Sequence, residues 1–340
     1  MKFDKENKKN NILINIFKKN NYKKGDNYKI NNLINIQIHI KKKFGKNKKK
    51  YKLTLICLCF MIINIFSYIK YKQILIPFFK QPNLLNIYIV THKDFVNVLS
   101  SPVYKILCDE KSVLKKVYNL PIIETNKDNI LFPKKRGYGE CSKIYPIWKL
   151  YKEGILKSKY VGINHYKRIF PFKNNIPDLD KIFKNYDAIL KKRFKLGITI
   201  REQFNYGHIA KFLNESVDII KEKFPEYYQY AISLLEKRWG NFCNIFIMKK
   251  EDFIKWGDLV FGVLLELDKR YNLTTDNDIS KLIIKESKRL NKKVNIPYQS
   301  RLEGFLSERI SNIFYQRHFK KVYEIPTLNG RFIYQKNPKF

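Results

Sequence analysis

Residues 160–170 read YVGINHYKRIF, and this stretch decides the expected fold class. The apolar run at 160–163 has the composition of a buried β-strand. Five polar or aromatic residues, 164–168, follow directly at its carboxyl end. Ligands of α/β sheets gather beyond the strand ends, so this cluster favours a ligand site. The alternative is a packing role, in which the histidine and tyrosine are hydrogen-bonded in the core and Arg168 is paired with an acid.

Strands and helices alternate on both sides of this stretch. Short apolar, β-branched runs predict further strands at 86–91, 186–190 and 244–248. Apolar residues at helical spacing predict helices at 142–154, 200–213, 214–223, 225–237 and 250–270. Such alternation predicts an α/β fold, a Rossmann-like mixed sheet flanked by helices.

The amino-terminal part of the chain has a different composition. Residues 1–52 hold 17 lysines and 3 acidic residues without a persistent period, which predicts a basic and largely disordered tail. Residues 53–69, LTLICLCFMIINIFSYI, carry no charge, and this length is the lower limit for a helix that spans a bilayer. The lysine-dense flank places the helix N-terminus in the cytoplasm. A cleaved signal peptide and a buried core helix are the alternatives.

These segments give a domain map and a location. The map comprises a cytoplasmic tail (1–52), a transmembrane helix (53–69), a stem (70–85), a catalytic domain (86–326) and a C-terminal tail (327–340). The expected topology is single-pass type II, in the Golgi or endoplasmic reticulum if the chain is eukaryotic. In such a lumen Asn214 and Asn272, each two residues before a Ser or Thr, are glycosylation acceptors.

Composition narrows the classes of partner. Hydrophobic residues make up 44% of the chain, enough to bury a core. The net charge of +38 is spread without a dense block beyond the tail. Together with the membrane helix, this distribution argues against a nucleic-acid partner. Two of the five cysteines fall within 53–69, and the other three are widely spaced, so buried free thiols are expected.

Six segments, in sequence order, resemble one family. They are IYIVTHK (87–93), YGECSKIYPIWK (138–149), YVGINHYKRIF (160–170), REQFNYGH (201–208), NIFIMKKEDF (244–253) and RLEGFLSERI (301–310). The chain thereby resembles the domain-of-unknown-function family 4422, whose members occur in capsular and exopolysaccharide biosynthesis proteins and are glycosyltransferase-like. The resemblance covers residues 86–326. Lys167 departs from the family's arginine and loses its planar two-pronged donor.

The resemblance implies a GT-A-like fold and a function. The expected protein is a membrane-anchored, hexosyltransferase-like enzyme that transfers a sugar from a nucleotide-sugar donor. The acceptor would be a glycan, a glycoprotein or a lipid-linked molecule, and residues 53–69 would hold the enzyme at the membrane. The alternative is a non-catalytic, membrane-tethered module that binds acidic glycans or lipids through its lysine-rich surface.

A sugar transferase must neutralise a diphosphate as the glycosidic bond breaks. GT-A enzymes usually do so with a divalent cation held by an Asp-x-Asp motif after a strand. Asp178–Asp180 and Asp276–Asp278 have this spacing but lie in polar stretches between elements, so we assign no metal ligand and leave a metal requirement open. We expect Arg168, with Lys167, to stabilise the diphosphate instead.

The remaining candidate residues follow from the strand ends and from the resemblance. The expected donor-binding residues are Thr91, His92, Lys93, Tyr166, Lys167 and Arg301. The expected catalytic residues are His165, Arg168, Asp187 and Glu140. An inverting transfer also needs a general base, and the carboxylates of Asp187, Glu140 and Glu308 are the candidates among which the sequence does not choose.

Overall fold

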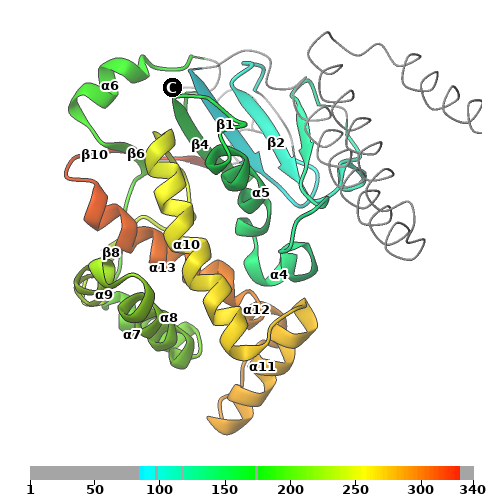
Figure 1. The fold of residues 1–340 in the computed structure, drawn as a ribbon, viewed down its shortest axis with the longest axis vertical. Coiled ribbons are helices and arrows are strands. Elements are labelled where there is room, and N and C mark those ends of the chain that lie inside the picture. Colours follow the sequence, from blue (N-terminus) through cyan, green and yellow to red (C-terminus); the bar gives the residue numbers. More distant parts are fainter. Residues whose placement is uncertain (1–83, 96–98, 117, 173–174, 330–340) are drawn as a thin grey trace, which may run out of the picture. The chain divides into compact units, whose positions relative to one another are not determined.

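The computed structural model describes residues 84–95, 99–116, 118–172 and 175–329 (Figure 1). The predicted basic tail (1–52) and transmembrane helix (53–69) lie outside the described residues, as do most of the predicted stem and C-terminal tail. Within the described ranges, no helix combines the length and apolar character needed to cross a bilayer.

A mixed β-sheet forms the centre of the described chain. Its main path runs in the order β10-β6-β9-β4-β1-β2-β3. These strands are β1 (Leu85–Val90), β2 (Tyr104–Cys108), β3 (Ile122–Glu124), β4 (Tyr160–His165), β6 (Ala188–Lys191), β9 (Phe246–Lys249) and β10 (Val322–Ile325). β1, β2, β3 and β4 are parallel, whereas β9 runs antiparallel between β4 and β6. The expected mixed α/β sheet is therefore confirmed.

Short strands extend or flank this sheet. β5 (Arg168–Ile169) pairs with the end of β4 and with β11 (Leu328–Asn329), which falls inside the segment expected to be a C-terminal tail. β7 (Phe194–Lys195) and β8 (Trp239–Gly240) form a separate two-stranded pair.

The register of the parallel strands brings their carboxyl ends to one edge. Val90 of β1 is opposite His165 of β4 on one side and Leu107 of β2 on the other. The residues that follow these strands, including Thr91 and Asp109, therefore come together at a single edge of the sheet. This is the edge at which α/β folds bind their ligands.

Helices cover the sheet and extend below it in the view of Figure 1. α5 (Cys141–Lys152) contacts β2, and α10 (Lys250–Tyr271) contacts both α5 and the β4–β9 pair. α13 (Leu302–His318) packs against α10. The remaining helices are α4 (Lys135–Tyr138), α6 (Leu179–Asn185), α7 (Ile200–Gly207), α8 (Ala210–Lys223), α9 (Tyr228–Leu235), α11 (Asp276–Arg289) and α12 (Ile296–Gln299).

The two faces of the sheet are packed differently. Because side chains alternate along a strand, Ile87 and Ile89 of β1 lie on one face, in an apolar core with Leu179 of α6. Tyr88 lies on the other face, where its hydroxyl is 3.2 Å from that of Tyr151 on α5. Both faces are buried, as a sheet with parallel central strands requires.

Most predicted elements are present with shifted ends. The strands expected at 86–91, 160–163, 186–190 and 244–248 are β1, β4, β6 and β9, and the helices expected at 142–154 and 250–270 are α5 and α10. The helix expected at 200–213 ends at Gly207, and α8 begins at Ala210. The break is stabilised by Lys292, whose ammonium group donates a 2.9 Å hydrogen bond to the carbonyl of His208.

The strand β2 was not predicted, because a lysine interrupts its apolar run. Lys105 is only 1% exposed, and its ammonium group donates to the Asn86 side chain at 2.7 Å.

The cysteines of the described residues form no disulfide, as expected. Cys108 and Cys141 are buried, and Cys243 is half-buried.

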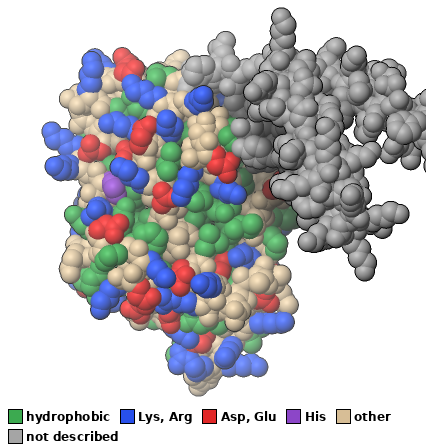
Figure 2. All heavy atoms as spheres, viewed as in Figure 1, with side chains coloured by type: hydrophobic (Ala, Val, Ile, Leu, Met, Phe, Trp, Pro, Cys, Tyr) green, Lys and Arg blue, Asp and Glu red, His purple; other side chains and the backbone are tan. Residues whose placement is uncertain are grey.

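Figure 2 shows one face of the described residues. Lysine and arginine side chains are interspersed there with aspartate and glutamate and with apolar side chains. On this face the mixture lacks the continuous basic stripe by which proteins follow a nucleic-acid backbone.

Candidate functional site

A cavity of about 660 Å³ lies at the carboxyl ends of β1, β2 and β4. Its walls come from those strand ends and the turn after β2, from α4 and the start of α5, from the segment before β9, and from α13 with the residue that precedes it. The lining includes Val90, Thr91, His92, Asp109, Val113, Lys135, Arg136, Gly139, Glu140, Lys143, His165, Tyr166, Lys167, Arg168, Cys243, Arg301 and Glu308. The structure thus brings together residues that the sequence places far apart.

A hairpin at the end of β4 carries the first predicted cluster into this cavity. His165 pairs with Arg168 across a two-residue turn made by Tyr166 and Lys167. The buried side chain of Asn164 accepts a 3.2 Å hydrogen bond from the backbone N–H of Phe170, which holds the returning strand. The cluster therefore lines a cavity and is not sealed in the core.

Two predicted site residues lie outside the lining. The ammonium group of Lys93 is 5.9 Å from the ring centroid of Tyr166, beside the cavity. Asp187 precedes β6, which is parallel to β4, so it lies at the opposite, amino edge of the sheet. Its carboxylate accepts hydrogen bonds from the backbone N–H groups of Lys320 (2.8 Å) and Lys321 (2.9 Å), which fixes the start of β10. This placement argues against Asp187 as the general base.

Cationic side chains dominate the cavity wall. Six lysines and arginines line it, namely Lys135, Arg136, Lys143, Lys167, Arg168 and Arg301, against the carboxylates of Asp109, Glu140 and Glu308. Lys143 is buried and forms an ion pair with Asp109 at 3.0 Å. Within the described part of the chain, no acid forms an ion pair with Arg168 or Arg301. Two guanidinium groups are therefore available to an anionic ligand.

Arg168 has a different neighbour in the described structure. Its Nη1 donates to the sulfur of Cys243 at 3.4 Å, a weak hydrogen bond. The packing alternative, in which Arg168 is paired with an acid in the core, therefore does not describe its contacts, and its side chain is exposed to the cavity.

The two histidines of the cavity are neutral at physiological pH. Burial, together with the charge of Arg168, lowers the pKa of His165 to about 3. Burial, followed by the charge of Lys143, also lowers the pKa of His92. The backbone N–H of Lys167 donates to Nδ1 of His165 at 3.2 Å, so the proton of the neutral ring sits on Nε2. His165 can therefore donate one hydrogen bond to a ligand.

The two glutamates have contrasting surroundings. Glu140 immediately precedes α5, and burial, followed by the negative charge of Glu308, raises its pKa to about 7. Glu308 forms an ion pair with Arg309 at 3.2 Å. A carboxyl group with a pKa near neutrality can take up and release a proton at physiological pH, so Glu140 suits proton transfer. Glu308 is held in place beside it by the ion pair.

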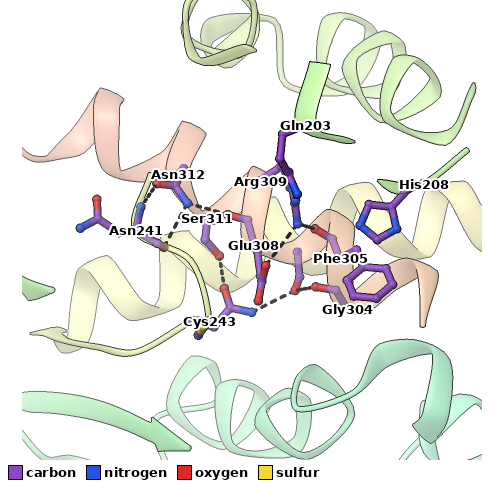
Figure 3. A network of polar contacts seen from close by, with 12 residues as sticks. Gln203, His208, Asn241, Cys243, Gly304, Phe305, Glu308, Arg309, Ser311 and Asn312 are labelled. Atoms are coloured by element: carbon purple, nitrogen blue, oxygen red, sulfur yellow. Dashed lines mark hydrogen bonds and ion pairs between the residues drawn. The ribbon is translucent and has the colours of Figure 1, made fainter. Parts of the chain in front are cut away.

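The segment before β9 contacts Glu140 through a hydrogen bond from Asn244. Cys243 and Asn244 have φ angles of +84° and +46°, in the left-handed region that few side chains adopt. The side-chain amide of Asn244 donates to Oε1 of Glu140 at 3.3 Å. Figure 3 shows the polar network around this bend, which includes Glu308 and Ser311 of α13.

Asp109 is a site residue that the sequence analysis missed. It follows β2 and is only 6% exposed. One of its oxygens faces Lys143, whereas Oδ1 has no hydrogen-bond partner among the described residues. The signal in the sequence is the alternation of Tyr104, Ile106 and Cys108 immediately before it, which Lys105 obscures.

The Asp-x-Asp pairs have structural contacts. Asp178 caps α6 by accepting the backbone N–H of Lys181 at 3.1 Å, and Asp180 accepts the hydroxyl of Tyr160 at 2.7 Å. Asp276 accepts the backbone N–H of Gly137 at 2.9 Å, and Asp278 forms a capping box with Thr275. Across the ranges that the structure describes, no three His, Cys, Asp or Glu side chains cluster as metal ligands.

Comparison with known proteins assigns the family. The model of the family described as "Domain of unknown function (DUF4422)" matches residues 86–284. The chain belongs to this family. The DUF4422 match spans the parts of the cavity contributed by β1, β2, α5, β4 and the segment before β9, whereas Arg301 and Glu308 lie beyond it.

One solved structure shares the fold of this DUF4422 protein. It is the apo structure of the bifunctional glycosyltransferase WbbM, with a TM-score of 0.52 and 21% sequence identity. The alignment covers 75% of this chain and 47% of WbbM, so the chain spans about half the length of that protein. At this identity the likeness shows a common fold. No curated protein matches the chain in sequence.

Proposed function

We propose that this protein is a glycosyltransferase that moves a sugar from a nucleotide-sugar donor to a glycan or lipid-linked acceptor. The observation that carries the proposal is the joint presence of Arg168, Arg301 and Glu140 in one cavity at the carboxyl edge of the sheet. The first two supply positive charge without an acid partner among the described residues. The third is a carboxyl group whose pKa of about 7 suits proton transfer.

The cationic wall suits the diphosphate of the donor. As the glycosidic bond breaks, negative charge accumulates on the leaving phosphate, and fixed cations stabilise that charge more than they stabilise the ground state. Arg168 and Arg301 would bind the phosphate oxygens, and the Nε2–H of His165 would donate one further hydrogen bond. A divalent cation remains compatible with this account, because the phosphates themselves supply oxygen ligands.

Asp109 suits the nucleoside. Its Oδ1 is a buried acceptor at the cavity without a partner among the described residues, and such an atom is costly to leave unsatisfied. A ribose hydroxyl or an N–H group of the base would satisfy it. Thr91 and His92, at the end of the neighbouring strand, flank the same space.

Glu140 would act as the general base. The acceptor hydroxyl oxygen bonds to the anomeric carbon while the bond from that carbon to the phosphate oxygen breaks. The electron pair leaves with the diphosphate, and the hydroxyl proton passes to the Glu140 carboxylate. Direct displacement of this kind inverts the anomeric configuration.

The membrane anchor is part of the proposal. The uncharged run at 53–69 and its lysine-rich amino-terminal flank support a type II anchor. The compartment would be the Golgi or the endoplasmic reticulum in a eukaryotic cell. A non-catalytic module that binds acidic glycans or lipids is the second candidate, favoured by the same cationic wall.

A donor screen separates the two candidates. The full chain is offered a panel of nucleotide sugars, with and without EDTA, and release of the nucleoside diphosphate is measured. We expect turnover of one donor class, and a loss of roughly 100-fold or more in Glu140→Gln because general-base catalysis contributes about that much. Binding of polyanions without turnover or thermal stabilisation by any donor would establish the module instead.

A further inference from the structure

We propose that Asn244 is a positioning residue for Glu140. A directional hydrogen-bond relay from Trp256 through Ser311 and Asn244 keeps Oε1 of Glu140 as an acceptor and leaves Oε2 to take the proton of the acceptor hydroxyl. The part of this inference in which Glu140 takes a proton from the acceptor rests on the proposed function. The relay itself is defined by the contacts in the structure.

The relay consists of three consecutive hydrogen bonds. The indole Nε1 of Trp256 donates to Oγ of Ser311 at 2.9 Å. Oγ of Ser311 donates to Oδ1 of Asn244 at 2.7 Å, and Nδ2 of Asn244 donates to Oε1 of Glu140 at 3.3 Å. Trp256, Ser311 and Asn244 are each 0% exposed, so water does not compete for these contacts.

The relay begins at a group that can only donate, the indole of Trp256. An indole N–H can only donate, so the Ser311 oxygen must accept from Trp256. The hydroxyl proton of Ser311 remains free to be donated, and it is donated to the carbonyl oxygen of Asn244. The amide NH₂ of Asn244 consequently faces Glu140.

A branch of the network fixes the same orientation independently. Nδ2 of Asn244 also donates to Oγ of Ser307 at 2.9 Å, and the hydroxyl of Ser307 donates a hydrogen bond to the backbone carbonyl of Gly304 at 2.7 Å. A carbonyl can only accept, so this branch also requires an N–H group on Asn244. A flipped amide would set an oxygen against the Glu140 carboxylate and break both branches. Figure 3 shows Ser311 and Gly304 on either side of this network.

The backbone at Asn244 makes the contact possible. Its φ of +46° lies in the left-handed region, which asparagine tolerates better than most residues. The relay joins Trp256 of α10 and Ser311 of α13 to the segment before β9 and to the start of α5. Replacement of Asn244 by glycine therefore removes the amide without adding backbone strain.

The relay has two consequences for Glu140. A donated N–H bond stabilises the carboxylate and lowers its pKa, opposing the effects of burial and of Glu308. Because Oε1 already accepts from Asn244, protonation is favoured on Oε2. The relay would thus choose the oxygen that receives the proton and keep the base available near neutral pH.

The test follows the protonation of Glu140 directly. Carboxyl infrared difference spectra of the full chain, recorded against Glu140→Gln, give its titration midpoint. We expect the midpoint to rise by about one pH unit in Asn244→Gly, because one charge-assisted hydrogen bond is lost. Ser311→Ala should raise it less. Ser216→Ala should leave it unchanged, since that buried serine donates only to the Phe212 carbonyl within α8.

Turnover provides the second measurement. With a donor from the screen, kcat at neutral pH should fall about tenfold in Asn244→Gly with little change in the KM for the donor. If the glycine variant does not fold, Asn244→Asp replaces it, because aspartate also tolerates a left-handed backbone. The two carboxyl groups would then share a proton, which should raise the titration midpoint of Glu140 further. Unchanged midpoints in Asn244→Gly and Ser311→Ala would overturn the relay. Shifted midpoints without turnover of any donor would uphold the relay and refute the proposed function.

Discussion

Glu140 and Glu308 line the same cavity, yet their carboxyl groups have different partners. Glu308 forms an ion pair with Arg309, whereas Glu140 accepts a long hydrogen bond from the neutral amide of Asn244. Burial, followed by the negative charge of Glu308, raises the pKa of Glu140 to about 7. The sequence could nominate both residues, but their roles depend on neighbours that lie elsewhere in the chain. Asn244, for example, is 104 residues from Glu140.

Removal of the Glu308 charge should move the acid limb of the pH–rate profile. A general base works when deprotonated, so the rate should rise with pH through the pKa of Glu140. Because the charge of Glu308 raises that pKa, we expect Glu308→Gln to shift the acid limb of kcat to lower pH. Glu251→Gln, an exposed glutamate at the start of α10, is the matched control. A limb that stays in place or moves to higher pH contradicts the assignment.

At the level of elements, the sequence predicts what local periodicity controls. The apolar runs of β1 and β4 and the amphipathic pattern of α10 are visible because each element is set by its own residues. β2 was missed because burial of Lys105 depends on Asn86, 19 residues away on a neighbouring strand. Asp109 was missed with it. The bend at Cys243 and Asn244 was likewise beyond prediction, since it is stabilised by α13.

Close packing of α5 on α10 gives a test at this level. Gly257 of α10 lies against the indole of Trp148, which donates to the carbonyl of Ile254 at 3.0 Å. A Cβ at position 257 would fall 2.1 Å from a ring carbon of Trp148. We expect Gly257→Ala to lower the free energy of unfolding by about 1–3 kcal/mol, despite the higher helix propensity of alanine. Chemical denaturation measures this loss.

The control for that experiment is Gly207→Ala at the end of α7. No atom lies within 4 Å of a Cβ built there, so the same substitution should be neutral or slightly stabilising. Equal stability of the two variants would show that the helices can separate without cost, and that Trp148 does not hold α5 in place.

At the level of the whole molecule, the site is assembled from both halves of the described chain. The strand ends and α5 lie within the DUF4422 match, whereas Glu308 on α13 and Arg301, immediately before α13, lie beyond it. Arg301 and Glu308 were named from the RLEGFLSERI segment at 301–310, which lies beyond the matched residues 86–284. What resemblance could not supply was the separation of Asp187 from the cavity, which follows from the direction of β6.

The most direct test of the central claim is calorimetric titration of the full chain with nucleoside diphosphates and monophosphates. If the cationic wall holds a diphosphate, one diphosphate should bind more tightly than its monophosphate. Arg168→Ala and Arg301→Ala should each weaken it by roughly tenfold or more. Arg201 lies on α7 and forms an ion pair with Glu236, so Arg201→Ala should not change the affinity. Equal affinities for diphosphate and monophosphate, or full affinity in Arg168→Ala, would contradict the account.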